Sequence, residues 1–137
     1  MTDKQFPDLR GLAYRSIDQA VTFLRQDGRL LLPFIVTEVG SELRLRRFAA
    51  PTLEAGLANA RQTLRSEGPF DRATLVWDGY YTSGGQKSDA VLIEAFEAGE
   101  AHGLYFAQPY EKTGTSPNLI EPFGNVKLLS ERAAPLF

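Results

Sequence analysis

Residues 73–108 read ATLVWDGYYTSGGQKSDAVLIEAFEAGEAHGLYFAQ, and the central strands of the predicted sheet lie in this stretch. It contains three runs rich in aliphatic, aromatic and β-branched residues, at 73–81, 89–97 and 104–108. The first two runs are joined by a glycine-containing stretch with the composition of a hairpin loop, and Gly99-Glu100 forms a tight turn before the third. Because connections this short join antiparallel strands, the stretch predicts an antiparallel sheet.

Two helices are predicted upstream of these strands. The first covers about residues 16–27, where Ser16 and Gln19 have the spacing of a capping box and Gly28 supplies a stop. The second opens near Pro51-Thr52 and ends at Gly68. Each carries a line of apolar residues at helical spacing: Ile17, Val21 and Leu24 in the first, and Leu53, Leu57 and Leu64 in the second.

A strand hairpin is predicted between the two helices. Its first run, residues 30–37, is apolar on both faces but contains Pro33, which cannot donate a ladder hydrogen bond. We therefore predict that this strand lies at a sheet edge or is bulged at Pro33. After a turn at residues 39–41, residues 43–46 alternate between leucine and arginine, as in a strand with one solvated face.

The predicted order is therefore helix, strand, strand, helix, strand, strand, strand. This order indicates a single α+β domain spanning residues 1–137, with an antiparallel sheet of about five strands. We expect both helices to pack on one face of that sheet. From about residue 112 the sequence is rich in Pro, Gly and Asn, and we expect this C-terminal segment to be irregular.

Composition excludes several classes of site and partner. The chain has no cysteine, so it forms no disulfide, thiolate metal site or thiolate nucleophile. Its net charge is −2, with 10 Lys/Arg against 8 Asp/Glu in residues 1–68 and 5 against 9 in residues 69–137. This distribution lacks the basic stripe typical of nucleic-acid binding, so no nucleic-acid partner is expected. The cluster of Arg44, Arg46 and Arg47 is interpreted as a solvated strand face.

The sequence also gives an expectation for localisation. The longest apolar run, residues 30–36, is too short to span a membrane, and the first ten residues do not resemble a signal peptide. We therefore expect a cytoplasmic protein without a membrane partner.

No motif in the sequence supports catalysis. His102 is the only histidine, and it lies beside a predicted turn, so neither a metal site nor a catalytic triad is expected. The glycine-rich stretch 79–88 is not a phosphate-binding loop, because Gln86 separates Gly85 from Lys87. No serine lies in a nucleophile elbow. We therefore expect no catalytic residue, metal or cofactor.

Strand register predicts which residues share a face. Centring the first hairpin on Gly85 places Trp77 opposite Ile93, and the Gly99-Glu100 turn places Ile93 opposite Phe106. These three residues are then expected to face the helices. In the same register Glu94 lies opposite Tyr105, and Asp78 lies opposite Leu92. The other face is therefore predicted to carry Asp78, Tyr80, Glu94, Phe96 and Tyr105.

This second face is the predicted binding site. Tyrosines mixed with carboxylates and a phenylalanine are a composition found at protein interfaces. The sequence therefore predicts a small non-catalytic interaction module that binds a protein partner or a second copy of itself. One alternative is that Leu119, Ile120 or Phe123 of the C-terminal segment folds back over the face. Another is a small-molecule-binding protein, or a small acid–base enzyme, with a pocket around Asp78 and Glu94.

Overall fold

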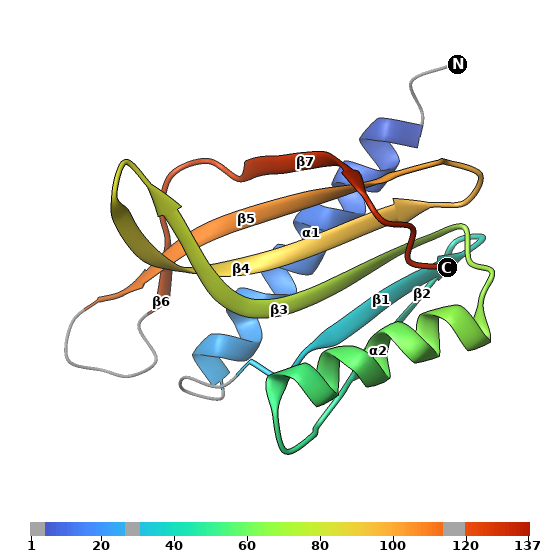
Figure 1. The fold of residues 1–137 in the computed structure, drawn as a ribbon, viewed down its shortest axis with the longest axis horizontal. Coiled ribbons are helices and arrows are strands. Elements are labelled where there is room, and N and C mark those ends of the chain that lie inside the picture. The colour runs from blue at the N-terminus through green and yellow to red at the C-terminus, as the bar shows by residue number, and fades with distance from the viewer. Residues whose placement is uncertain (1–4, 27–30, 114–119) are drawn as a thin grey trace.

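The computed structural model describes residues 5–26, 31–113 and 120–137. Helices and strands occupy most of these residues (Figure 1). In chain order the elements are α1 (Gln5–Gln26), β1 (Phe34–Val39), β2 (Glu42–Arg47), α2 (Leu53–Glu67), β3 (Arg72–Ser83), β4 (Gln86–Glu97), β5 (Gly103–Lys112), β6 (Ile120–Pro122) and β7 (Lys127–Ala133).

The strands form one antiparallel sheet in the order β2-β1-β3-β4-β5-β6, and β7 pairs with β5 beside β6. The predicted α+β class and antiparallel sheet are thus confirmed, with seven strands in the described residues instead of about five. The two additional strands, β6 and β7, come from the C-terminal segment that was expected to be irregular.

The prediction that the first strand lies at an edge is wrong. β1 begins at Phe34, directly after Pro33, and pairs with β2 on one side and β3 on the other. Since Pro33 precedes the strand, its missing N–H costs no ladder hydrogen bond. Its carbonyl oxygen instead accepts a hydrogen bond from the backbone N–H of Phe48 at 2.8 Å.

The two helices pack on opposite faces of the sheet, which corrects the expectation that they share one. Phe34, Val36 and Val76 belong to a cluster with α1, whereas Ile35 and Leu75 belong to a cluster with α2. In Figure 1, α1 crosses behind the sheet and α2 lies in front of it. The reason lies in the strands: β1 and β3 each contain four consecutive buried residues, and side chains of alternating direction need cover on both faces.

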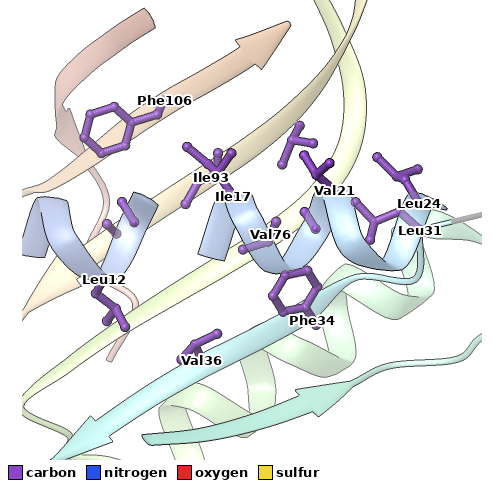
Figure 2. Packing of buried hydrophobic residues seen from close by; sticks show 14 of the residues in the cluster. Leu12, Ile17, Val21, Leu24, Leu31, Phe34, Val36, Val76, Ile93 and Phe106 are labelled. Carbon is purple, nitrogen blue, oxygen red and sulfur yellow. The ribbon is translucent and has the colours of Figure 1, made fainter. Parts of the chain in front are cut away.

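The larger cluster lies between α1 and the sheet (Figure 2). The predicted stripe of Ile17, Val21 and Leu24 is buried there, facing Ile93 and Phe106 of the central strands. The helix begins at Gln5, however, and not near residue 16. Buried residues at 9, 12 and 13 continue the same stripe upstream, with the i, i+3, i+4 spacing of a helix.

Ser16 is a buried residue within α1 and not the N-terminal cap that was predicted. Its Oγ donates to the carbonyl oxygen of Leu12 at 2.8 Å and lies 2.7 Å from Oγ1 of Thr74 on β3. Both hydroxyl side chains are fully or almost fully buried. The polar residue that resembled a cap thus fixes the helix to the centre of the sheet.

We expect the substitutions Ser16→Ala and Thr74→Val to be strongly coupled. Ser16→Ala leaves the Thr74 hydroxyl without its buried partner, at a cost of about 1–3 kcal/mol, whereas Thr74→Val leaves Ser16 Oγ only its hydrogen bond to the carbonyl oxygen of Leu12. The double variant should lose clearly less than the sum of the two, because it leaves neither hydroxyl unpaired. Urea unfolding of the four proteins measures the coupling, and additive losses would contradict the buried pairing.

The predicted second helix is confirmed at both ends. Oγ1 of Thr52 accepts a hydrogen bond from the N–H of Ala55 at 3.1 Å, and Gly68 ends the helix. Of the predicted apolar line, Leu64 is buried and Leu57 is half-buried, but Leu53 is 44% exposed. The C-terminal residue Phe137 packs edge-on against Phe70 and Phe96, with ring centroids 5.5 and 5.0 Å apart.

The β3–β4 register differs from the prediction by one residue, whereas the β4–β5 register is confirmed. Trp77 pairs with Leu92 and Ile93 pairs with Phe106. The first hairpin closes through Gly84 and Gly85, with φ angles of +57° and +80°. Two residues with positive φ form the two-residue turn that matches strand twist, so the turn is one residue shorter than a loop centred on Gly85.

Four charged side chains meet on the α1 face, at the start of β3. Arg72 lies 3.3 Å from Glu97, 3.2 Å from Glu38 and 3.3 Å from Asp8, measured between nitrogen and oxygen atoms. The side chain of Arg72 is 18% exposed and that of Glu97 is 6% exposed. One guanidinium therefore holds α1, β1 and β4 to β3.

Candidate functional site

The α2 face of the sheet carries a group of aromatic and charged side chains, packed around Leu92, that helix α2 covers only in part. We call this group the aromatic face. Its members come from α2 and from the three central strands: Arg61, Trp77, Tyr81, Leu92, Glu94 and Tyr105. The helix itself packs through Ala60 and Leu64 against Ile35 and Leu75.

Two rings lie parallel on this face. The ring centroids of Trp77 and Tyr105 are 6.0 Å apart, and the ring planes are inclined by 14°. Trp77 comes from β3 and Tyr105 from β5, so the two side chains meet above the intervening strand β4. Both rings are half-buried, and together with Tyr81 they cover a floor of Ala90, Leu92 and Ala107.

The floor beneath the rings contains two small residues, Ala90 and Ala107. Gly79 pairs with Ala90, and a Cβ atom added to Gly79 would lie 2.5 Å from Cδ1 of Leu92. A larger residue at position 79 would therefore displace Leu92, over which Trp77 and Tyr105 pack.

An ion pair lies beside the rings. Nη1 of Arg61 donates to Oε1 of Glu94 at 2.7 Å, and the guanidinium carbon of Arg61 lies 6.0 Å from the centroid of the Trp77 ring. Burial raises the pKa of Tyr105, the negative charge of Glu94 raises it further, and Arg61 opposes the shift. Tyr105 therefore keeps its proton at neutral pH and presents a hydroxyl donor.

The five predicted site residues do not share one face. Glu94 and Tyr105 lie opposite each other, as predicted, and Phe96 is on the same face but buried beneath Phe137. Asp78 and Tyr80 lie on the α1 face instead. The one-residue difference in register explains this split, because it exchanges the two faces of β3 relative to β4.

The predicted pocket around Asp78 and Glu94 is thus divided by the sheet. Asp78 pairs with Val91, which belongs to the α1 cluster, whereas Glu94 pairs with Leu75 of the α2 cluster. The two carboxylates therefore cannot line one pocket.

Asp78 has a structural partner on its own side of the sheet. The hydroxyl of Tyr110 on β5 donates to Oδ1 of Asp78 at 2.8 Å. Burial raises the pKa of Asp78, although the hydrogen bond from Tyr110 lowers it; burial also raises the pKa of Tyr110. The pair ties β3 to β5 across β4. Tyr80 is 62% exposed, with the ammonium of Lys87 4.1 Å from its ring centroid.

The C-terminal segment covers only part of the α2 face. Leu136 and Phe137 pack over Phe96 near α2. Ile120 is buried in the α1 cluster, Phe123 is 42% exposed, and Leu119 lies outside the described residues. Neither Ile120 nor Phe123 thus provides the predicted cover over Trp77 and Tyr105.

Sequence reasoning missed Arg61, Trp77, Tyr81 and Leu92 as members of this face. Trp77 was assigned to the opposite face with Ile93, and Leu92 was used only as a partner for Asp78. The consecutive apolar residues of β3 and β4 could have indicated that both faces are covered, which would have placed α2 and Arg61 beside Glu94.

The three clustered arginines do not form one basic patch. Arg44 and Arg46 line a cleft on the α2 side and pair with Glu42 and Glu67, at 3.4 and 2.8 Å. Arg47 instead lies over the ring of Phe23 on α1, 4.0 Å from its centroid.

In the described part of the chain, neither helix has the length and apolar character needed to cross a membrane. Within the same residues, no three His, Asp or Glu side chains come together as a group that could hold a metal ion. Comparison of the chain with protein-family models, curated proteins and solved structures gives no significant match.

Proposed function

We propose that this protein is a non-catalytic interaction module that associates with a second copy of itself through the aromatic face. The observation that carries the proposal is the stacked Trp77–Tyr105 pair, which lies half-buried on a sheet face that α2 and the C-terminal residues leave open. Trp, Tyr and Arg are the residue types that contribute most binding energy at protein interfaces. The aromatic face contains all three.

The charges on this face favour a second copy as the partner. Arg61 and Glu94 carry opposite charges, and they are adjacent. In a two-fold dimer each surface meets its own image, so Arg61 of one copy can approach Glu94 of the other without an excess of either sign. We place this dimer in the cytoplasm, where a chain without cysteine is unaffected by the reducing environment.

The combined substitutions Tyr105→Ala and Glu94→Arg are expected to weaken association strongly while the domain stays folded. Truncating one hot-spot residue costs about 2 kcal/mol or more of binding energy, so the dimer should weaken by about 30-fold or more. Sedimentation velocity measures the association, and circular dichroism checks the fold. The matched control is Tyr80→Ala with Glu131→Arg, which changes the same residue types at exposed positions away from the aromatic face.

A charge exchange gives a sharper test of the symmetric contact. The variant Arg61→Glu, Glu94→Arg restores the ion pair within the chain and should dimerise with itself. Mixed with the parent, it should form few heterodimers, because Arg61 of the parent would meet the introduced arginine of the variant. A parent that stays monomeric at its highest soluble concentration would overturn the proposal, and so would free exchange between the two proteins.

A further inference from the structure

A cavity, which we call the hairpin cavity, lies at the far end of the α2 face, where it shares Tyr81 with the aromatic face. Its volume is about 380 Å³, within the range of pockets that hold small molecules. Three parts of the chain form it: the end of the β3–β4 hairpin, β5, and the stretch between β6 and β7, which runs beside the hairpin in Figure 1. Its apolar wall consists of Tyr81, Pro109 and Phe123.

The wall is held in place by hydrogen bonds between β5 and the segment that follows β6. The N–H of Phe123 donates to the carbonyl oxygen of Pro109 at 3.1 Å. Nε2 of Gln108 donates to the carbonyl oxygens of Pro109 and Phe123, at 2.9 and 3.2 Å. The ring of Phe123 is nevertheless 42% exposed, so an apolar surface remains open on a backbone that is fixed.

The charged residues that line the cavity are both lysines. Lys127 pairs with Ala107 of β5, which places it on the same sheet face as the cavity, and Lys87 belongs to the hairpin. Within the described residues, no carboxylate forms an ion pair with either lysine. The ammonium of Lys87 lies over the ring of Tyr80, so Lys127 is the cation available to a ligand. Ser83 and Ser88 add hydroxyl groups to the lining.

The cleft between β2 and α2 has a similar volume, about 350 Å³, but a different charge balance. Its arginines, Arg44 and Arg46, are already paired with Glu42 and Glu67. The hairpin cavity differs because, among the described residues, its lysines have no such carboxylate partners, in a chain whose net charge is −2.

From the open apolar wall and the ammonium group of Lys127 beside it, we propose that the hairpin cavity binds a small amphipathic carboxylate with a flat apolar body. The body would lie against Tyr81, Pro109 and Phe123, and the carboxylate would reach Lys127. A charged ligand gains a charge-assisted hydrogen bond there that a neutral analogue of the same shape cannot make. This proposal does not depend on self-association, because neither Trp77 nor Tyr105 lines the cavity, although Tyr81 belongs to both sites.

The test uses 2-naphthoate as the probe and its neutral amide, 2-naphthamide, as the matched ligand. Each is titrated into the ¹⁵N-labelled protein, and backbone amide shifts are followed by NMR. We expect 2-naphthoate to bind more tightly, with the largest shifts at Tyr81, Ser88 and Phe123. Lys127→Gln should weaken naphthoate about threefold to tenfold, as expected for a partly exposed charged contact, and leave naphthamide unchanged. Lys112→Gln, at an exposed lysine outside the cavity, should change neither.

A second variant distinguishes the contribution of the apolar wall to binding from that of the Lys127 charge. Phe123→Ala should weaken both ligands, and the exposed position of Phe123 allows the variant to fold. Equal affinity for the two ligands would overturn the proposal, as would unchanged naphthoate binding in Lys127→Gln. Shifts centred on Trp77, or no binding up to the solubility limit of the probe, would overturn it as well. None of these results bears on dimerisation, which is measured separately by sedimentation.

Discussion

Replacing Leu64 by alanine is expected to lower the free energy of unfolding by about 2–5 kcal/mol. Leu64 is fully buried where α2 packs on Ile35 and Leu75, so truncation leaves a cavity in addition to the lost apolar burial. A loss of this size is a large part of the stability of a small domain. Urea unfolding measures it.

Leu53→Ala is the matched control, since it makes the same chemical change on the same helix. Leu53 is 44% exposed, and its truncation should change the free energy of unfolding by no more than about 0.5 kcal/mol. Similar losses for the two variants would show that α2 does not pack on the sheet through Ala60 and Leu64. The comparison therefore tests the arrangement of one helix on each face.

Replacing Arg72 by methionine is expected to cost about 3 kcal/mol at pH 7, because it leaves the buried Glu97 without a counter-charge. Glu38 and Asp8 lose the same partner, and both carboxylates then lie beside the apolar methionine side chain. Arg46→Met is the control, because the Arg46–Glu67 pair is exposed and should contribute less than about 1 kcal/mol.

The Arg72→Met loss is also expected to depend on pH. Burial already raises the pKa of Glu97, and Arg72 opposes that shift, so removing Arg72 raises the pKa further. A carboxyl whose pKa is raised in the folded state contributes stability below its unfolded pKa of about 4.3, and this contribution is lost as pH rises through the folded pKa. The difference between variant and parent should therefore be smaller at pH 4 than at pH 7. Urea unfolding at both pH values measures it, and equal differences would contradict the role given to Glu97.

The sequence predicted the positions of most helices and strands better than it predicted which face of the sheet each side chain lies on. Glycine turns, apolar runs and the start of the second helix near Pro51-Thr52 have local causes, so they were recognised from neighbouring residues. The β3–β4 register depends on whether the turn contains two residues or three, and Gly84-Gly85-Gln86 is compatible with both. The choice is made by the positive φ angles of the two glycines, which the order of residues does not reveal.

The errors in the predicted site follow from this one-residue difference in the β3–β4 register. Because Trp77 was placed opposite Ile93, Asp78 and Tyr80 were grouped with Glu94 and Tyr105, and Trp77 was left out. The Glu94–Tyr105 pairing was predicted correctly, because the β4–β5 register was correct. Arg61 could not be placed from its own helix, since its contact with Glu94 joins residues 33 positions apart and depends on which face α2 covers.

The two ends of the sheet limit how copies of this protein can assemble. All six residues of β2 are exposed, and three of them are arginines, so a strand added there would have to dehydrate several charges. At the other end, the β5–β7 ladder has register shifts between Gly103 and Phe106, which disturb the regular row of hydrogen bonds that an added strand needs. Neither edge is a good template for continuous growth into a fibril. Association through a face, by contrast, ends when two copies have covered each other.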